Sequence, residues 1–200
     1  MRIDSDFVRA QFPAFEVPAL QGRAFFENAG GSYTCSHVIN RLTRFYTERK
    51  VQPYAAYAPS SLGGAEMDEA RTRMAAILGV QGDELSFGPS TTQNTYVLAQ
   101  AFAEMMDPGE AIIVTNQDHE ANSGPWRRLA ARGIEIREWR IDPETGCLNP
   151  EDLENILDEK VRLVCFPHCS NVVGEINPVT EITALAHAAG AFTCVDGVSY

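Results

Sequence analysis

Polar segments follow four of the predicted strands, and their side chains could bind an anion, a cation and an aromatic ring. The segments are Gly88–Asn94, Asn116–Asn122, Pro167–Asn171 and the single residue Asp196. The carboxyl ends of parallel strands meet at one edge of a sheet, and ligands of such sheets bind at that edge. We therefore expect the four segments to border one crevice.

Each segment has a chemical interpretation and an ordinary alternative. Gly88–Thr92 is small, rich in hydroxyl groups and opens a predicted helix, so it could bind a phosphate or simply cap the helix. His119 could be a catalytic or stacking imidazole, or only a loop histidine. Asp196 follows an apolar run and needs a partner if it is buried. That partner could be a cationic ligand nitrogen, a backbone N–H group or an arginine.

Other site chemistries are not indicated. Cys165, His168 and Cys169 are close in sequence but lack a second ligand pair at zinc-site spacing, so we expect no metal site. The chain has no G-x-G-x-x-G motif, no Walker loop and no G-x-S-x-G elbow. These features argue against the common nucleotide-binding folds and against an α/β-hydrolase.

The elements that must position these residues alternate regularly from residue 84 onward. Short apolar or β-branched runs alternate with segments of helical periodicity, which predicts βαβ units and an α/β fold: a mostly parallel sheet covered by helices on both faces. The predicted strands are 84–87, 111–115, 134–139, 161–166 and 191–195, and the predicted helices are 91–106, 122–132, 150–157 and 179–189.

The first part of the chain has a less regular pattern. We expect helices over 4–11, over 36–50 behind a Ser36 cap and over 66–78, a strand over 24–26, a turn over 27–31 and a loop over 54–64. The helix over 66–78 would turn its apolar side inward and pair Glu69 with Arg73 on its outer side. The inward residues would be Met67, Ala70, Met74, Ile77 and Leu78. We expect residues 1–60 to form an amino-terminal segment and residues 61–200 a larger domain.

The composition narrows the class of protein. The 200 residues are 44% hydrophobic and 22% charged, as in ordinary globular domains. Sixteen Lys and Arg against 27 Asp and Glu give a net charge of -11, so we expect neither nucleic acid nor an anionic membrane as a partner. The acidic start does not resemble a signal peptide, and five scattered cysteines indicate a reduced, cytoplasmic protein.

Five motifs in order give the chain a family resemblance. They are Phe26–Gly31, Gly88–Thr92, Asp118–Asn122 followed by Pro125–Trp126, Ser170–Pro178, and Val195–Gly197. In this order they resemble pyridoxal-phosphate (PLP) enzymes of fold type I. The closer resemblance is to aminotransferase class V, the branch that contains cysteine desulfurases and selenocysteine lyases.

The resemblance implies a PLP site and a role for each site residue. Ser90 and Thr91 would hold the cofactor phosphate, and His119 would stack on the pyridine ring and shuttle protons. Asp196 would pair with the protonated ring nitrogen, which lets the ring accept electrons from the substrate. Asn171 would bond the phenolic oxygen or the substrate, Ser199 stands where desulfurases usually have a glutamine for that oxygen, and Asn28 with Ala29 would line the substrate side.

The resemblance also implies a lysine that binds the cofactor as a Schiff base, further along the chain than the aspartate. The two lysines of this sequence, Lys50 and Lys160, are not expected at the site, because one ends a helix and the other precedes a strand. We therefore expect the chain to be the amino-terminal part of a homodimeric, cytoplasmic PLP-dependent lyase or transferase, and to be inactive alone.

The activity implied for the whole protein is cleavage of the C–S bond of cysteine. Another class V activity, epimerase-like or kynureninase-like, would use the same cofactor residues. A non-catalytic α/β module that binds an anionic small molecule at Gly88–Thr92 is an alternative from a different class.

Overall fold

The computed structural model describes residues 3–200, which divide into two compact units at the bond between Phe87 and Gly88. The N-terminal unit is helical, whereas the second unit is an α/β domain. Each unit is described by itself. The division expected at residues 60 and 61 concerned the roles of the two parts and stays a prediction.

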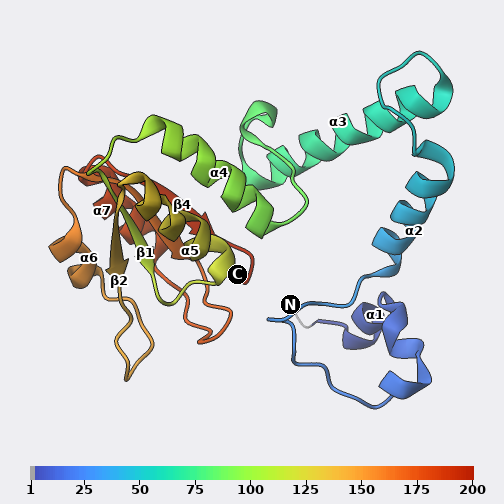
Figure 1. Cartoon of the computed structure of the whole chain (residues 1–200). Coiled ribbons are helices and arrows are strands. Elements are labelled where there is room, and N and C mark those ends of the chain that lie inside the picture. Colours follow the sequence, from blue (N-terminus) through green and yellow to red (C-terminus); the bar gives the residue numbers. More distant parts are fainter. Residues whose placement is uncertain (1–2) are drawn as a thin grey trace. The chain divides into compact units, whose positions relative to one another are not determined.

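Four parallel strands form the sheet of the second unit, in the order β2-β1-β3-β4 (Figure 1). Parallel pairing joins β1 to β2, β1 to β3, and β3 to β4. This confirms the predicted α/β class and four of the predicted strands. The strands are β1 Ala111–Thr115, β2 Glu135–Trp139, β3 Val161–Pro167 and β4 Phe192–Asp196.

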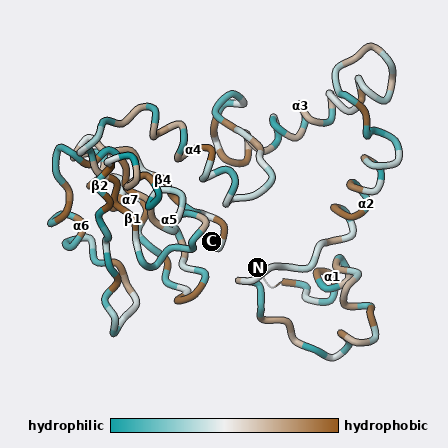
Figure 2. Tube along the Cα trace, in the orientation of Figure 1, coloured by the Kyte–Doolittle hydropathy of each residue, from teal (hydrophilic) through white to brown (hydrophobic). Residues whose placement is uncertain are grey.

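Helices cover both faces of this sheet. Ile112 and Val114 of β1 pack with Trp126 on one side, in a cluster to which α4 and α5 contribute. Ala111 and Ile113 point to the other side, where α6 and α7 contribute. Alternate residues of a strand face opposite sides, so β1 needs apolar residues throughout and is brown in Figure 2. The helices are α4 Thr91–Met105, α5 Glu120–Arg127, α6 Pro150–Ile156 and α7 Val179–Ala188.

The strand register brings the expected site segments to one edge. Thr115 lies opposite Trp139, and Pro167 lies opposite Asp196, so the strands end nearly level. The helix α4 leads through a short connection into the start of β1, so its first residues lie toward the carboxyl edge of the strands. The loops after β1, β3 and β4 and the start of α4 therefore share this edge.

The N-terminal unit consists of helices and irregular segments. Short 3₁₀-helices follow α1, a π-helical turn over Phe45–Arg49 extends α2, and a left-handed Gly79 ends α3 as predicted. Glu27 and Asn28 accept the backbone bonds of the predicted turn. The α-helices are α1 Ser5–Ala10, α2 Ser36–Arg44 and α3 Ala58–Leu78.

Two predicted strands are wrong. Residues 24–26 are not paired with any strand, and Glu84 ends a 3₁₀-helix at Gly82–Glu84, after which residues 85–87 do not join the sheet. A strand needs a neighbouring backbone to take its N–H and C=O groups, and neither segment has one in the described chain. The Ser36 cap is also wrong, because Cys35 occupies the N-cap position and no side chain caps the helix.

The predicted loop over 54–64 is helical from Ala58 onward. Pro59 lies in the first turn, where its missing N–H is tolerated, and Gly64 lies against the ring of Tyr54. A Cβ atom at Gly64 would lie 2.5 Å from a Tyr54 ring carbon, so this contact requires glycine. Packing therefore overrides the weak helix propensity of this segment.

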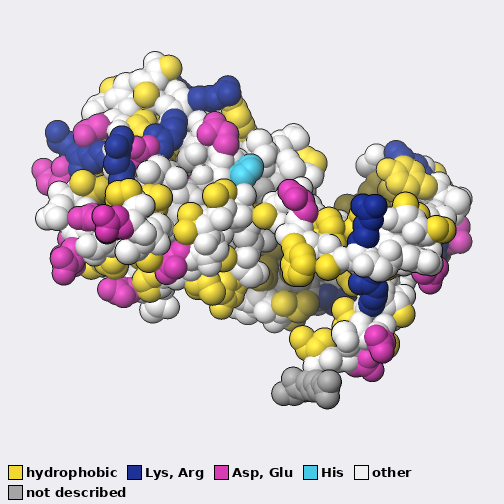
Figure 3. All heavy atoms as spheres, turned by 90° about the horizontal axis from the view of Figure 1, so that it is seen from below, with side chains coloured by type: hydrophobic (Ala, Val, Ile, Leu, Met, Phe, Trp, Pro, Cys, Tyr) yellow, Lys and Arg dark blue, Asp and Glu magenta, His cyan; other side chains and the backbone are white. Residues whose placement is uncertain are grey.

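The inward orientation predicted for the apolar side of α3 is wrong. Met67, Met74, Ile77 and Leu78 are exposed, Ile77 by 78%, and Ala70 is exposed as well. Figure 3 shows hydrophobic side chains at the surface in several places. Apolar residues of α3 instead line an open groove against α2, with a volume of about 630 Å³.

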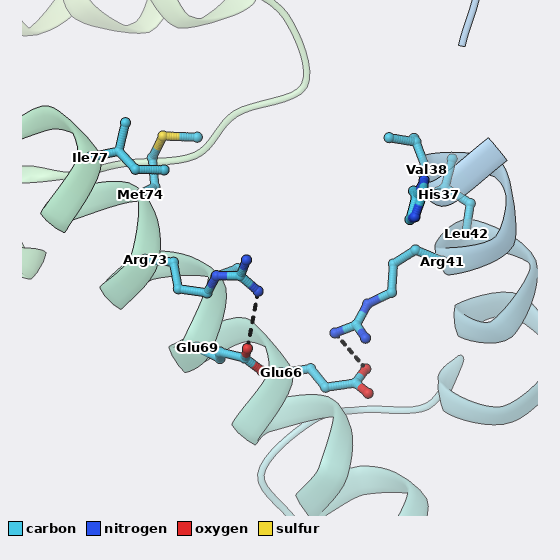
Figure 4. Close-up of a pocket in the computed structure, with 10 residues that line it drawn as sticks. His37, Val38, Arg41, Leu42, Glu66, Glu69, Arg73, Met74 and Ile77 are labelled. Carbon is cyan, nitrogen blue, oxygen red and sulfur yellow. Dashed lines mark hydrogen bonds and ion pairs between the residues drawn. The ribbon is translucent and has the colours of Figure 1, made fainter. Parts of the chain in front are cut away.

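Ion pairs connect the two helices beside this groove (Figure 4). Glu66 of α3 accepts a hydrogen bond from Arg44 of α2 at 2.8 Å. It also forms ion pairs with Arg41 of α2 at 3.4 Å and with Arg49 at 3.9 Å. The predicted pair of Glu69 and Arg73 forms within α3 at 3.3 Å and is more exposed. Glu66 is thus the shared carboxylate of three guanidinium groups.

We expect Glu66→Gln to lower the free energy of unfolding by about 1–2 kcal/mol, because three arginines lose one half-buried partner. The matched control Glu69→Gln should change it by less than about 0.5 kcal/mol, since exposed pairs contribute little. Urea unfolding of both variants measures the difference. Equal effects would contradict the role assigned to Glu66.

Candidate functional site

Two buried amides join the loops that follow β1 and β3. The Asn177 amide donates to Oε1 of Gln117 at 2.6 Å and to the carbonyl of Pro167 at 2.7 Å. Gln117 in turn donates to the carbonyl of Gly146 at 2.8 Å. Sequence reasoning assigned no role to this pair, although polar residues directly after buried strands were a signal for it.

Ser170 sets the turn that carries Asn171. Its hydroxyl donates to the carbonyl of Gln117 at 3.3 Å and accepts from the N–H of Val173 at 3.2 Å. The N–H of Gly174, which has a φ of 77°, closes the turn onto the carbonyl of Ser170 at 2.9 Å. Asn171 is therefore held at the edge of the sheet, half-buried.

The start of α4 combines a helix cap with free donors. Ser90 is the N-cap, and its hydroxyl accepts from the N–H of Gln93 at 3.2 Å, so the ordinary interpretation of this serine is confirmed. A cap leaves other first-turn N–H groups unpaired, including that of Thr91, and these can still bind an anion. At Gly88 a Cβ atom would lie 1.6 Å from Oδ1 of Asn94, so any other residue would require the Asn94 side chain to move.

His119 is exposed and begins α5 as its N-cap. Its Nδ1 atom accepts from the N–H of Ala121 at 3.0 Å, which fixes the orientation of the ring. Nε2 and the ring faces are left for a ligand or solvent. An imidazole held in this way is suited to stacking and to hydrogen bonding at one nitrogen.

Asp196 ends β4 and is half-buried. Its Oδ1 atom accepts from the N–H of Val198 at 2.9 Å. Of the partners expected for Asp196, which were a ligand cation, a backbone N–H group or an arginine, the described chain therefore supplies the backbone N–H group. Ser199 lies in the turn that follows. Nearby, the rings of His168 and Tyr200 stack with centroids 3.5 Å apart.

Asp118 is a second carboxyl at this edge, and its environment is unusual. Oδ2 accepts from the amide of Asn122 at 2.6 Å, whereas Oδ1 is buried with no hydrogen-bond partner among residues 3–200. Burial, together with the negative charge of Asp196, raises the pKa of Asp118 to about 7. Asp118 is part of the Asp118–Asn122 motif, but the sequence predicted no role for it.

The thiols of Cys165 and Cys194 lie near Asp118, and Cys194 is linked to it through Asn122. Cys194 of β4 donates to Oδ1 of Asn122 at 3.6 Å, and a hydrogen bond from Cys165 lowers the pKa of the Cys194 thiol. Burial raises the pKa of Cys165 well above its ordinary value. Cys165 and Cys194 are direct neighbours in the register of β3 and β4.

The remaining predicted residues belong to other elements. Asn28 and Ala29 lie in the 27–31 turn of the N-terminal unit. Lys50 belongs to the same unit. Lys160 precedes β3 at the amino edge of the sheet, opposite the site. In residues 3–200 there is no group of three acidic, histidine or cysteine side chains arranged for a metal ion, and no helix there is long and apolar enough to cross a membrane.

Comparison with curated proteins gives relatives of about twice the length. The aminotransferase-like protein FGM3 of Gibberella zeae is 38% identical over 96% of this chain and 48% of its own. A cysteine desulfurase of Serratia proteamaculans is 34% identical over 95% of this chain and 48% of its own. The chain therefore spans about half the length of the curated relatives it matches.

Solved structures share the fold. The apo structure of a cysteine desulfurase from Thermococcus onnurineus NA1 matches 98% of this chain and 48% of its own, with a TM-score of 0.87 and 26% identity. The cysteine desulfurase CsdA of Escherichia coli has a TM-score of 0.83 at 23% identity, which shows a common fold. The expected fold class is confirmed by these likenesses.

The family model for aminotransferase class-V matches residues 24–200, which include the start of α4, the loops after β1 and β3, and the end of β4. With the order of motifs and the arrangement of the sheet, this match shows that the chain belongs to the aminotransferase class-V family.

Proposed function

We propose that the protein containing this chain is a PLP-dependent enzyme of the cysteine desulfurase kind, which cleaves the C–S bond of cysteine. The observation that carries the proposal is the shared edge of Asp196, His119 and the start of α4. These groups suit a cation, an aromatic ring and a phosphate. The names of the relatives favour the desulfurase activity.

The residues present fit this cofactor. Gly88 and the first turn of α4 offer a small, donor-rich cradle for a phosphate. Asp196 is held by one backbone bond through Oδ1 and faces no arginine or lysine in the described chain, so it can accept a cationic nitrogen. A C-DES mutant of the same fold, with a TM-score of 0.73, is described with a PLP cofactor.

When bound, PLP supplies an electron-accepting ring for reactions at the Cα atom of an amino acid. We assign phosphate binding to Ser90 and Thr91. We assign to His119 both stacking on the ring and proton transfer through its Nε2 atom. Asp196 would keep the proton on the ring nitrogen. Asn171 and Ser199 would serve the phenolic oxygen, and Asn28 with Ala29 the substrate.

The finer parts of the proposal are homodimerisation and a cytoplasmic location. The five free cysteines favour a reducing compartment. An epimerase-like or kynureninase-like activity would use the same residues of this chain, and only a product assay on the whole protein with cysteine as substrate separates them. Formation of alanine, with transfer of the cysteine sulfur to an acceptor thiol as a persulfide, is the expected result.

The role of Asp196 is tested on this chain with 4′-deoxypyridoxine 5′-phosphate, which has the ring and phosphate but cannot react with a lysine. We expect Asp196→Ala to weaken binding at least about tenfold in equilibrium dialysis, because the ring cation loses its counter-charge. The control Asp152→Asn, on exposed α6, should leave affinity unchanged. Unchanged affinity of the Asp196 variant would refute the assignment.

The phosphate role of Ser90 is tested separately. Ser90→Gly removes the hydroxyl but costs only a few tenths of a kcal/mol as a helix cap, so the fold should be kept. We expect affinity for the phosphorylated analogue to fall about tenfold, which corresponds to one lost charge-assisted bond. Affinity for 4′-deoxypyridoxine, which lacks the phosphate, should not change. A parallel loss for both compounds would place the effect outside the phosphate site.

A further inference from the structure

Hydrogen bonds run in one direction from the sheet to Asp118. The thiol of Cys194 donates to Oδ1 of Asn122 at 3.6 Å, and the amide of Asn122 donates to Oδ2 of Asp118 at 2.6 Å. Every member of this series uses its donor toward the next. Oδ2 of Asp118 is therefore held as an acceptor.

The other oxygen of Asp118 is the one that can carry a proton. Oδ1 is buried and has no hydrogen-bond partner in the described residues. A buried oxygen with a full charge and no donor is costly, whereas a neutral carboxyl in the same place costs much less. The geometry thus separates the two oxygens, with Oδ2 accepting and Oδ1 available for protonation.

Asp196 lies on the same side of the sheet. Residues two apart on a strand face the same way, so Cys194 and Asp196 both point toward α4 and α5, where Phe102 of α4 meets Phe192. The charge of Asp196 acts on Asp118 from this position. The thiols of Cys194 on β4 and Cys165 on β3 also feel the charge of Asp118, α5 contributes the neutral amide of Asn122, and the backbone N–H of His119 acts against the rise of the Asp118 pKa.

Building on the proposed cofactor site, we propose that Asp118 is a positioning residue that holds a proton on Oδ1 while Asp196 carries the negative charge, and releases that proton when a cation binds at Asp196. The proton passes to solvent, and the second carboxylate then shares the cation. The site would thus gain one negative charge when it binds a cation. A merely structural Asp118 would keep the same protonation in both states.

The first test measures Asp118 without any ligand, by the pH dependence of its carboxyl ¹³C signal. We expect titration near pH 7 in the unmodified chain and at lower pH in Asp196→Asn, because a neighbouring negative charge has been removed. Asp152→Asn should leave the titration of Asp118 unchanged. An unchanged pKa in Asp196→Asn would overturn the proposal, whether or not the chain binds a cofactor.

The second test adds 4′-deoxypyridoxine 5′-phosphate. Saturation should lower the pKa of Asp118 from about 7 to about 6 or below, whereas inorganic phosphate alone should leave it unchanged. If the analogue binds and the pKa stays the same, proton release by Asp118 is refuted while the cofactor site stands. If the analogue does not bind, both this proposal and the proposed function fail.

Stability gives a readout that does not depend on the ligand. A raised folded-state pKa stabilises the fold fully below the unfolded value of 3.8, and this contribution disappears as the pH rises through about 7. The urea midpoint should therefore fall between pH 4 and 7, and Asp118→Asn should reduce this fall while keeping the bond to Asn122. An identical pH dependence in the variant would contradict a protonated Asp118.

Discussion

The buried amide pair of Gln117 and Asn177 is the contact on which the carboxyl edge of the sheet depends. It joins the loops after β1 and β3, and Ser170 adds a further bond between them. Without it, the backbone of both loops would leave polar groups unpaired inside the protein. His119 and Asn171 belong to the loops that this pair and Ser170 join.

Much of the second unit could be predicted from sequence, because its central strands β1 and β3 are buried on two faces and are therefore almost entirely apolar. The N-terminal unit could not be predicted as well. Its apolar residues line an open groove or stay exposed, so their spacing does not identify a buried face. The strands expected at 24–26 and 84–87 lack partner strands. Pattern alone cannot supply a partner strand.

The location of the site was also predictable, since it follows from where parallel strands end. The state of its charges was not. Asp118 differs from an ordinary loop aspartate because of its burial and because of Asp196, which lies more than seventy residues away in sequence and is brought to the same edge by the pairing of β4 with β3. Sequence motifs name the residues, whereas burial decides which of them are charged.

The position of β4 has a consequence for the order of folding. β4 pairs only with β3 in the described sheet, so Asp196 reaches the carboxyl edge only when these two strands have paired. Parallel sheets need long-range contacts and form slowly for that reason. A ligand that bridges the start of α4 and the end of β4 would bind only when β4 has joined β3, and would draw the folding equilibrium toward the paired state.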